Sequence, residues 1–328
     1  MDGRSITINK SGYDPFIDFL KAYSIICVII AHILPSSVLY KYFLFHVWGD
    51  MQVPMFVLIQ VFHAYKKGTQ PRLNRDGLFK RICLPFLVVQ GVIVLFKALI
   101  GEFLWKDLVF SGGLGPGSYY IWVYIQMALL LIIIWPWVKR VSFDSLLVAF
   151  LILSICIEVL FSMIELPDRL YRLLCVRYLF LIPLSLLWIE KGILLNRKTV
   201  LLSILSIVAV IFFFHTNYDL EPFFFNTGWK THRWICYFYI PVLLTYGLYI
   251  VWNRIQQLQM IVKIVKWTAT RSYEIFLSQM AVLACFPFAY FSYILSGVIG
   301  YSIWVIVAFS LSLFFGGVIY RFRKIVLK

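Results

Sequence analysis

The amino-acid sequence predicts an all-α integral membrane protein with about ten transmembrane helices, and two observations predict this fold class. Hydrophobic residues make up 62% of the 328 residues and charged residues only 14%, whereas soluble domains carry roughly 45–50% apolar and about 25% charged residues. Apolar runs long enough to cross a hydrocarbon core of roughly 30 Å as helices recur along the chain. These runs lack the short alternating pattern of transmembrane strands, so the spanning elements are predicted to be helices.

We interpret residues 1–328 as one polytopic domain, because no linker, internal repeat or low-complexity stretch divides the sequence. No small-residue cleavage site follows the first apolar run, so we expect it to be a retained helix rather than a signal peptide. Arg172 and Arg177 interrupt the sixth predicted span. The predicted spans are 16–34, 44–65, 80–100, 119–138, 144–165, 172–190, 199–215, 234–252, 272–292 and 297–319.

The basic residues follow the positive-inside rule. The sequence holds 30 Lys and Arg against 15 Asp and Glu, a formal net charge of +15. If the N-terminus is cytoplasmic, most basic residues fall in cytoplasmic segments, and an even number of crossings makes both termini cytoplasmic. Topology thus explains the charge, and no nucleic-acid partner is expected. The basic residues predicted on the outer side are Lys41, Lys106, Arg169, Arg172, Arg177, Lys230 and Arg233.

Two predicted outer segments, 101–118 and 214–233, are long, aromatic and mildly polar. Aromatic rings with a few polar groups suit contact with sugars, and they equally suit the aromatic belt at a membrane edge. The glycine-rich stretch SGGLGPG at 111–117 lacks the lysine of a phosphate-binding loop and any preceding strand, so no phosphate loop is expected there.

The first predicted helix carries three ionisable side chains, Asp18, Lys21 and His32. Each costs a few kcal/mol inside a membrane, so such residues usually face a bundle interior or a watery cavity. Lys21 and His32 are eleven positions apart, which places them within roughly 20° on one helix face and about 16 Å apart along the axis. Asp18 lies one turn before Lys21, and the two also fit a simple ion pair with Lys21 snorkelling to lipid headgroups. The helix therefore predicts a polar track from the cytoplasmic mouth to deep in the membrane.

The remaining chemistry-bearing residues are interpreted as structural. The six cysteines occur singly and no Cys/His cluster has metal-ligand spacing, so no metal site is expected. Glu274 is expected to pair with Arg271, three residues earlier on the same helix. The histidines interpreted as interfacial or loop residues are His46, His63, His215 and His232.

Several short motifs, in order along most of the chain, resemble those of the acyltransferase 3 family. The segment FIDFLKAYSIICVIIAHILP at 16–35 is similar to the first helix of that family, in which a basic residue, usually Arg, precedes a histidine by eleven positions. This chain departs from the family pattern with Lys21 for Arg, Gln60-Val61 for a Ser-Gly pair, and Gln279 where many relatives carry His. The other matching segments are VPMFVLIQ at 53–60, KRICLP at 80–85, GSYYIWVYIQMALL at 117–130 and RSYEIFLSQ at 271–279.

The resemblance implies a membrane O-acyltransferase. Such an enzyme moves an acyl group, most often acetyl, from cytoplasmic acyl-CoA to a sugar hydroxyl of an extracytoplasmic or lipid-linked glycan. Acetyl-CoA is then a donor substrate, and no permanently bound cofactor is expected. The resemblance also implies a multi-pass protein of the bacterial inner membrane, with membrane lipid as its surroundings. The sequence leaves the acceptor glycan and the oligomeric state open.

The resemblance also suggests roles for individual residues. His32 is the expected general base, or the nucleophile of an acyl-histidine intermediate. Asp18 is expected to orient Lys21 or to bind part of the donor. Asp50, predicted at the outer start of the second helix, is the candidate hydrogen-bond partner of His32. The basic residues expected to meet the donor phosphates are Lys21, Lys80, Arg81 and Arg271.

Two other functions fit parts of the sequence. A transporter or flippase for a lipid-linked sugar or small anion would explain many helices and a polar track, although the internal repeats common in transporters are missing from the sequence. A membrane glycosyltransferase would need acidic outer loops, for which Asp219 and Glu221 are the available residues.

Overall fold

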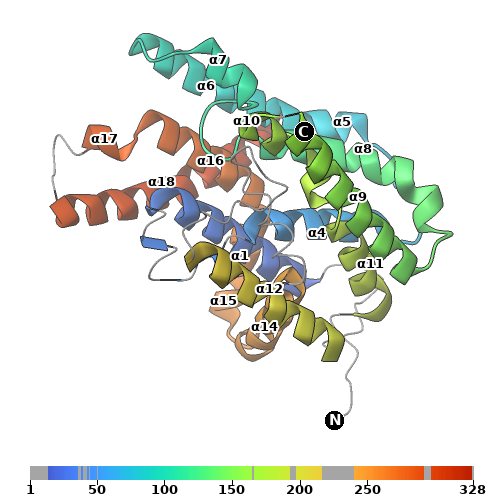
Figure 1. Cartoon of the computed structure of the whole chain (residues 1–328). Coiled ribbons are helices and arrows are strands. Elements are labelled where there is room, and N and C mark those ends of the chain that lie inside the picture. The colour runs from blue at the N-terminus through green and yellow to red at the C-terminus, as the bar shows by residue number, and fades with distance from the viewer. Residues whose placement is uncertain are drawn as a thin grey trace.

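The computed structural model confirms a helical protein: every regular element in its described residues is a helix (Figure 1). The described residues are 14–35, 38–39, 43, 45–49, 51–164, 166–192, 197–215, 240–291 and 297–326. In the first half of the chain the helices are α1 (Pro15–Ile33), α3 (Phe45–Trp48), α4 (Gln52–Tyr65), α5 (Arg75–Leu78), the π-helical η1 (Phe79–Cys83), α6 (Leu84–Leu99), α7 (Trp105–Phe110), α8 (Tyr120–Val138) and α9 (Phe143–Met163). They continue with α10 (Asp168–Arg172), the 3₁₀-helical η2 (Cys175–Tyr178), α11 (Leu181–Lys191), α12 (Arg197–His215), α14 (Ile240–Ile255), α15 (Gln259–Thr270), α16 (Ser272–Cys285), α17 (Phe288–Phe291) and α18 (Gly297–Val326).

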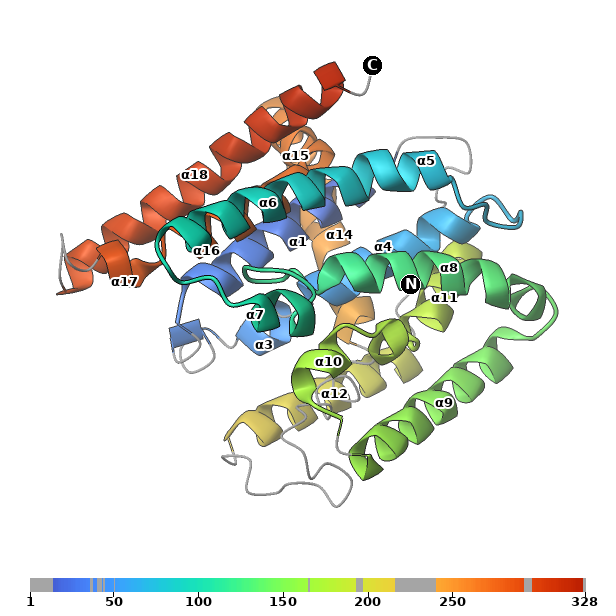
Figure 2. The ribbon, with the colours of Figure 1, turned by 90° about the horizontal axis from the view of Figure 1, so that it is seen from above.

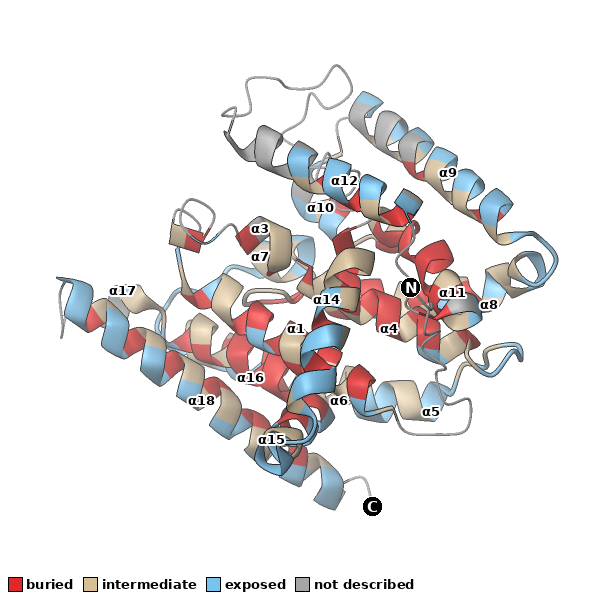
Figure 3. Ribbon diagram, turned by 90° about the horizontal axis from the view of Figure 1, so that it is seen from below, coloured by how far each residue is buried: buried red, intermediate tan, exposed pale blue. Residues whose placement is uncertain are grey.

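Helix α1 lies at the centre of the bundle. It starts where the Asp14 side chain accepts a hydrogen bond from the Phe16 amide at 2.9 Å and Pro15 occupies the first turn, which satisfies an end amide and presets the helical backbone. It packs against α4, α14, α15, α16 and α18, and Figure 3 shows it among the buried residues while the outer helices are mostly exposed. The single polar stripe predicted from the sequence is therefore enclosed by protein.

The end of α4 lies beside the beginning of α1. Phe62, near the end of α4, and Phe16, near the beginning of α1, both contact the Trp188 ring, with centroid distances of 4.9 and 6.4 Å. Helix α8 runs parallel to α4. The Gln60 amide donates to the Tyr124 carbonyl at 2.9 Å, and further along both helices the Tyr65 hydroxyl donates to the Leu131 carbonyl at 2.8 Å. Three helices are thus aligned along one axis.

The predicted spans agree with the helices, but the number of crossings stays a prediction. Each predicted range contains a helix, and the expected interruption of the sixth span corresponds to α10 and η2 before α11; residues 234–239 of the eighth lie outside the described residues. Within the described part of the chain, four helices are long and apolar enough to cross a membrane: Pro15–Ile33, Arg75–Leu99, Tyr120–Val138 and Gly297–Ile325. Shorter apolar helices include Gln52–Tyr65 and Ser272–Cys285. The sequence analysis expected no element at α15, which packs on α1.

The outer helices present apolar surface. Helices α6 and α18 lie along one side of the bundle in Figure 2, and their exposed side chains include Leu95, Leu99, Ile306 and Phe314. A soluble monomer rarely exposes contiguous apolar patches of this kind, whereas lipid tails cover them without cost. The protein is therefore a membrane protein.

Helices α16 and α18 pack closely at Gly316. A Cβ at this glycine would lie 2.6 Å from Ile275 Cγ1 and 2.7 Å from Ile275 Cα, so only glycine permits this separation, as at other close membrane-helix crossings. Glu274, 1% exposed, forms an ion pair with Arg323 of α18. The ion pair is thus made with a guanidinium from α18 rather than with Arg271, the predicted partner, which interacts with the carboxylate by charge alone.

Replacement of Gly316 by Ala should destabilise the protein, whereas replacement of its neighbour Gly317 should not. The Gly316 methyl would meet Ile275 backbone, and overpacking of this kind costs about 1–3 kcal/mol. A Cβ at Gly317 would meet only Trp267 Cζ2 at 3.4 Å, so G317A gains helix propensity without a clash. The melting temperatures of both variants in detergent test this packing, and equal values for G316A and G317A would contradict it.

Candidate active site

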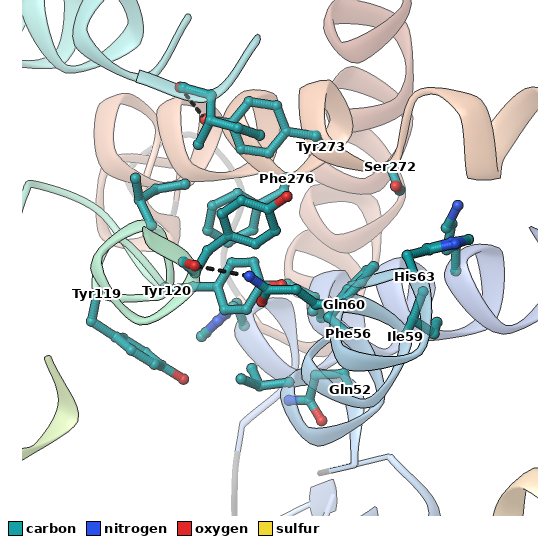
Figure 4. Close-up of a pocket in the computed structure, with 18 residues that line it drawn as sticks. Gln52, Phe56, Ile59, Gln60, His63, Tyr119, Tyr120, Ser272, Tyr273 and Phe276 are labelled. Atoms are coloured by element: carbon teal, nitrogen blue, oxygen red, sulfur yellow. Dashed lines mark hydrogen bonds between the residues drawn. The ribbon is translucent and has the colours of Figure 1, made fainter. Parts of the chain in front are cut away.

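A cavity of about 330 Å³ lies between α1, α4, α8 and α16 (Figure 4). Aromatic rings form much of its wall: Phe56 and Tyr120 have centroids 6.0 Å apart, and Tyr120 and Phe276 are 5.9 Å apart. Across the described residues, no three His, Cys, Asp or Glu side chains gather as metal ligands would. The lining residues that carry polar groups are Lys21, His32, Gln52, Gln60, His63, Tyr119, Tyr120, Tyr124, Ser272 and Tyr273.

Helix α1 contributes Lys21, Val28 and His32 to the cavity wall. This arrangement confirms the predicted shared face, which places Lys21 and His32 about 16 Å apart along the helix. Lys21 Nζ lies 3.8 Å from Asp18 Oδ1, so the ion pair expected from the sequence is present. Asp18 does not line the cavity, and its contact with the site is through Lys21.

His32 projects into the cavity from the buried part of α1. Its neighbours Ile29 and Ile33 are buried, yet the imidazole is exposed because its free surface faces the cavity. No hydrogen bond joins the ring to another described residue. Asp50, the predicted partner of His32, lies outside the described residues. The imidazole is thus available to a bound molecule.

Helix α4 supplies a second polar stripe that the sequence analysis missed. Gln52, Gln60 and His63 face the cavity from positions i, i+8 and i+11, which share one face of a helix. His63 lies close enough to Lys21 for their charges to interact. The sequence analysis interpreted His63 as an interfacial or loop residue and did not predict that it lines the cavity; its spacing from Gln52 and Gln60 was the signal that could have found this.

The glycine-rich loop before α8 closes the cavity beside His32. A Cβ at Gly117 would lie 2.9 Å from the Phe276 ring and 3.7 Å from His32 Nε2. Gly117 has a φ of +84°, which side chains other than glycine rarely adopt. Gln90 holds the loop in place, because its amide accepts from the Leu114 N–H at 2.7 Å and donates to the Leu114 carbonyl at 2.9 Å. The glycine-rich loop, which the sequence analysis placed in an outer segment, therefore forms part of the cavity wall.

The cavity has two distinguishable ends. We call the part lined by Lys21, His63 and Ser272 the Lys21 end, and the part lined by His32 and Gly117 the His32 end. In Figure 4, His63 and Ser272 lie on one side of the cavity and Tyr119 on the other, with Gln60 between them.

The other predicted donor-binding residues lie next to the Lys21 end rather than in it. Lys80 and Arg81 are exposed on η1 and directly precede Ile82, which lines the cavity; the Tyr273 hydroxyl donates to the Ile82 carbonyl at 2.6 Å. Arg271 directly precedes Ser272 and stacks between two rings, 4.7 Å from the Trp267 centroid and 4.5 Å from that of Tyr320. These three cations are thus within two residues of a residue that lines the cavity, whereas Lys21 is the one of the four that lines it itself.

Other residues singled out in the sequence do not join the site. Gln279 is 0% exposed on α16, and neither of its amide atoms has a hydrogen-bond partner among the described residues. It does not line the cavity. The segment 216–239, which contains most of the second aromatic stretch with Asp219, Glu221 and His232, lies outside the described residues.

An apolar helical bundle that encloses ionisable side chains around a cavity is typical of integral membrane enzymes and transporters. The chain matches the family model described as an acyltransferase domain, acyltransferase 3, over residues 14–321. It therefore belongs to the acyltransferase 3 family and is an acyltransferase. No curated protein and no solved structure matches the chain.

Replacement of Gly117 by Ala should lower acyl-transfer turnover about tenfold or more, because a methyl group displaces Phe276 and crowds His32, and small misplacements in an active site have large effects on rate. Gly101 is the matched control, since its φ of +75° imposes the same backbone strain while nothing lies within 4 Å of its Cβ position. Turnover of the purified variants, each normalised to its folded fraction, tests whether the close approach of Gly117 to Phe276 and His32 matters for activity. Equal losses in G117A and G101A would show that backbone strain rather than contact with His32 matters.

Proposed function

We propose that this acyltransferase transfers an acyl group, most often acetyl, from cytoplasmic acyl-CoA to a sugar hydroxyl of an extracytoplasmic or lipid-linked glycan. The observation that carries the proposal is one cavity with a lysine at one end and, at the other, an imidazole that makes no hydrogen bond to the described residues. Acyl-CoA joins a polyanionic head to a thioester by a long arm, and this cavity offers cations and a base in the corresponding order. Family membership favours this function over the transporter and glycosyltransferase alternatives.

The donor enters at the Lys21 end in this proposal. Lys21 is part of the cavity wall, and Lys80, Arg81 and Arg271 lie next to its mouth. Charge-assisted hydrogen bonds from such groups to phosphates are among the strong ones in proteins. Arg271 is held by two aromatic rings, so little side-chain entropy is lost when its guanidinium meets an anion.

Chemistry takes place at the His32 end. A neutral His32 takes the proton of the sugar hydroxyl while the hydroxyl oxygen attacks the thioester carbonyl carbon. The tetrahedral intermediate then collapses with cleavage of the carbon–sulfur bond, and the imidazolium returns its proton to the leaving thiolate. In the two-step alternative, the His32 ring nitrogen attacks first and forms an acyl-imidazole, which the hydroxyl resolves. Both routes use the same imidazole.

The proposal implies a multi-pass protein of a bacterial inner membrane. Because the cavity extends along α1 for much of the length of a membrane span, a donor from one side and an acceptor from the other can meet without either crossing completely. The cytoplasmic location of both termini and of the Lys21 end are parts of this proposal.

His32→Ala should reduce acetyl transfer by about 10²- to 10⁴-fold, the usual contribution of general acid–base catalysis. The measurement is transfer of radiolabelled acetyl from acetyl-CoA to surface glycan by the purified protein in liposomes, with the melting temperature of the variant as a check on folding. Label that remains on the wild-type protein when acceptor is left out, and is absent from the variant, would indicate the acyl-histidine route. Unchanged transfer by H32A would refute the role of His32.

Lys21→Ala should raise the KM for acetyl-CoA by about tenfold or more, because a charge-assisted hydrogen bond contributes about 1.5–3 kcal/mol, and Lys21→Arg should restore donor use. Lys97 is the matched control, since it also lies within an apolar helix and pairs with a carboxylate, Glu102, at 3.7 Å, but does not line the cavity. Donor KM values of the three variants test this role. Equal KM values for K21A and K97A would remove Lys21 from donor binding.

A further inference from the structure

Helix α15 packs against the bundle along one face. Val265, Thr268 and Ala269 are buried, and Val265 and Ala269 belong to the same buried cluster as Leu20 of α1. The helix has 12 residues, which rise about 18 Å, well short of a hydrocarbon core of roughly 30 Å. Helix α15 is therefore a surface helix that rests on α1 and does not span a membrane.

The exposed face of α15 has an apolar side and a basic side. Met260 is 75% exposed and Ile264, one turn later, is 53% exposed; Lys263 and Lys266 are exposed on the other side. At about 100° per residue, Trp267 lies between the two sides, and it is 38% exposed. We call these five residues the α15 outer face. Its order, apolar then aromatic then basic, matches the change from acyl chains to headgroups at the surface of a bilayer.

Helix α15 lies beside the last turns of a membrane-spanning helix. Helix α18 is long and apolar enough to cross a membrane, and Trp267 Cζ2 lies 3.4 Å from the position that a Cβ on Gly317 would take. Arg271, directly after α15, stacks on the rings of Trp267 and of Tyr320 in α18. Figures 2 and 3 show α15 beside the C-terminal part of α18. Because a spanning helix leaves the hydrocarbon at its end, these contacts place α15 near the surface of the bilayer.

The cations at this surface are not balanced by carboxylates. From residue 222 to the end of the chain, Glu274 is the one acidic residue of the sequence. Its carboxylate is buried and forms an ion pair with Arg323, so it offers no charge to the outer face. The surface is therefore complementary to an anionic partner. The exposed cations on α15 and on the last turns of α18 are Lys263, Lys266, Arg321 and Lys324.

We propose that α15 lies in the plane of the bilayer surface and that its outer face binds anionic phospholipid headgroups. Lys263 and Lys266 meet the headgroup phosphates, while Met260 and Ile264 lie among the upper parts of the acyl chains. A water-soluble anion would need the cations alone and would leave the apolar side uncovered. The exposed apolar side chains next to a membrane-spanning helix favour a lipid. This inference is independent of the acyl-transfer reaction.

The test measures the melting temperature of the full-length protein in neutral detergent micelles that contain phosphatidylglycerol or phosphatidylcholine with the same acyl chains. Phosphatidylglycerol should raise the melting temperature above the phosphatidylcholine value by about 2–4 °C, because a ligand of the folded state stabilises it. The double variant Lys263→Gln, Lys266→Gln should lose about half or more of this difference. Its melting temperature in phosphatidylcholine should match that of the wild type, since both side chains are exposed.

The matched control is Lys139→Gln with Arg140→Gln, in the turn between α8 and α9. It removes the same number of exposed cations at a distance in sequence from α15, and should keep the wild-type preference for phosphatidylglycerol. Met260→Ser tests the apolar side and should reduce the preference. The deacylated headgroup, glycerophosphoglycerol, should give no shift at the same concentration, because it lacks the acyl chains.

Four results would overturn the inference. Equal melting temperatures of the wild type in the two lipids would show that it has no anionic lipid site. A full preference in the double lysine variant, or an equal loss in the Lys139 and Arg140 control, would show that α15 is not the site. A shift with glycerophosphoglycerol as large as that with phosphatidylglycerol would show a site for soluble anions instead of a lipid surface.

Discussion

The structure depends on one constraint, that the ionisable side chains of α1 must not face lipid. Lys21 and His32 lie on the same face of an apolar helix, and each would cost a few kcal/mol in hydrocarbon. The bundle meets this constraint by surrounding α1 with α4, α14, α15, α16 and α18. The polar face then borders a cavity rather than a packed interface, because α4, α8 and α16 present their own polar and aromatic side chains to it.

The walls of this cavity are fixed by contacts that allow little adjustment. Gly117 lets the loop backbone approach His32 and Phe276, and Gln90 holds the same loop through both ends of its amide. In the α16 wall, the Tyr273 hydroxyl ties α16 to η1, and Glu274 ties α16 to α18 through Arg323. Such rigidity raises the rate of group transfer between two bound substrates, because their effective concentration depends on how well the reacting atoms are held in place.

The sequence predicted those parts of the site that follow from the periodicity of one helix. It missed the parts that depend on how helices pack against one another. Lys21 and His32 share a helix, so their common face follows from the eleven-residue spacing alone. His63 belongs to another helix, and its approach to Lys21 depends on how α4 packs beside α1. For the same reason Glu274 was assigned to Arg271 on its own helix, when the chain segment that supplies its partner, Arg323, is some fifty residues away in sequence. Lys80 and Arg81 are exposed just before Ile82, which lines the cavity, and their role in donor binding stays a prediction.

By itself the sequence determined the helical membrane character, the family and the polar face of the first helix, because hydropathy, motif order and helix geometry are properties of single segments. Only the tertiary structure decided that this face borders a cavity, that His63 and Gln60 line it, and that Gly117 lies against His32. These features arise from the packing of four helices that are distant in sequence. Packing angles and close approaches between such helices depend on all the contacting side chains together, and no single segment specifies them.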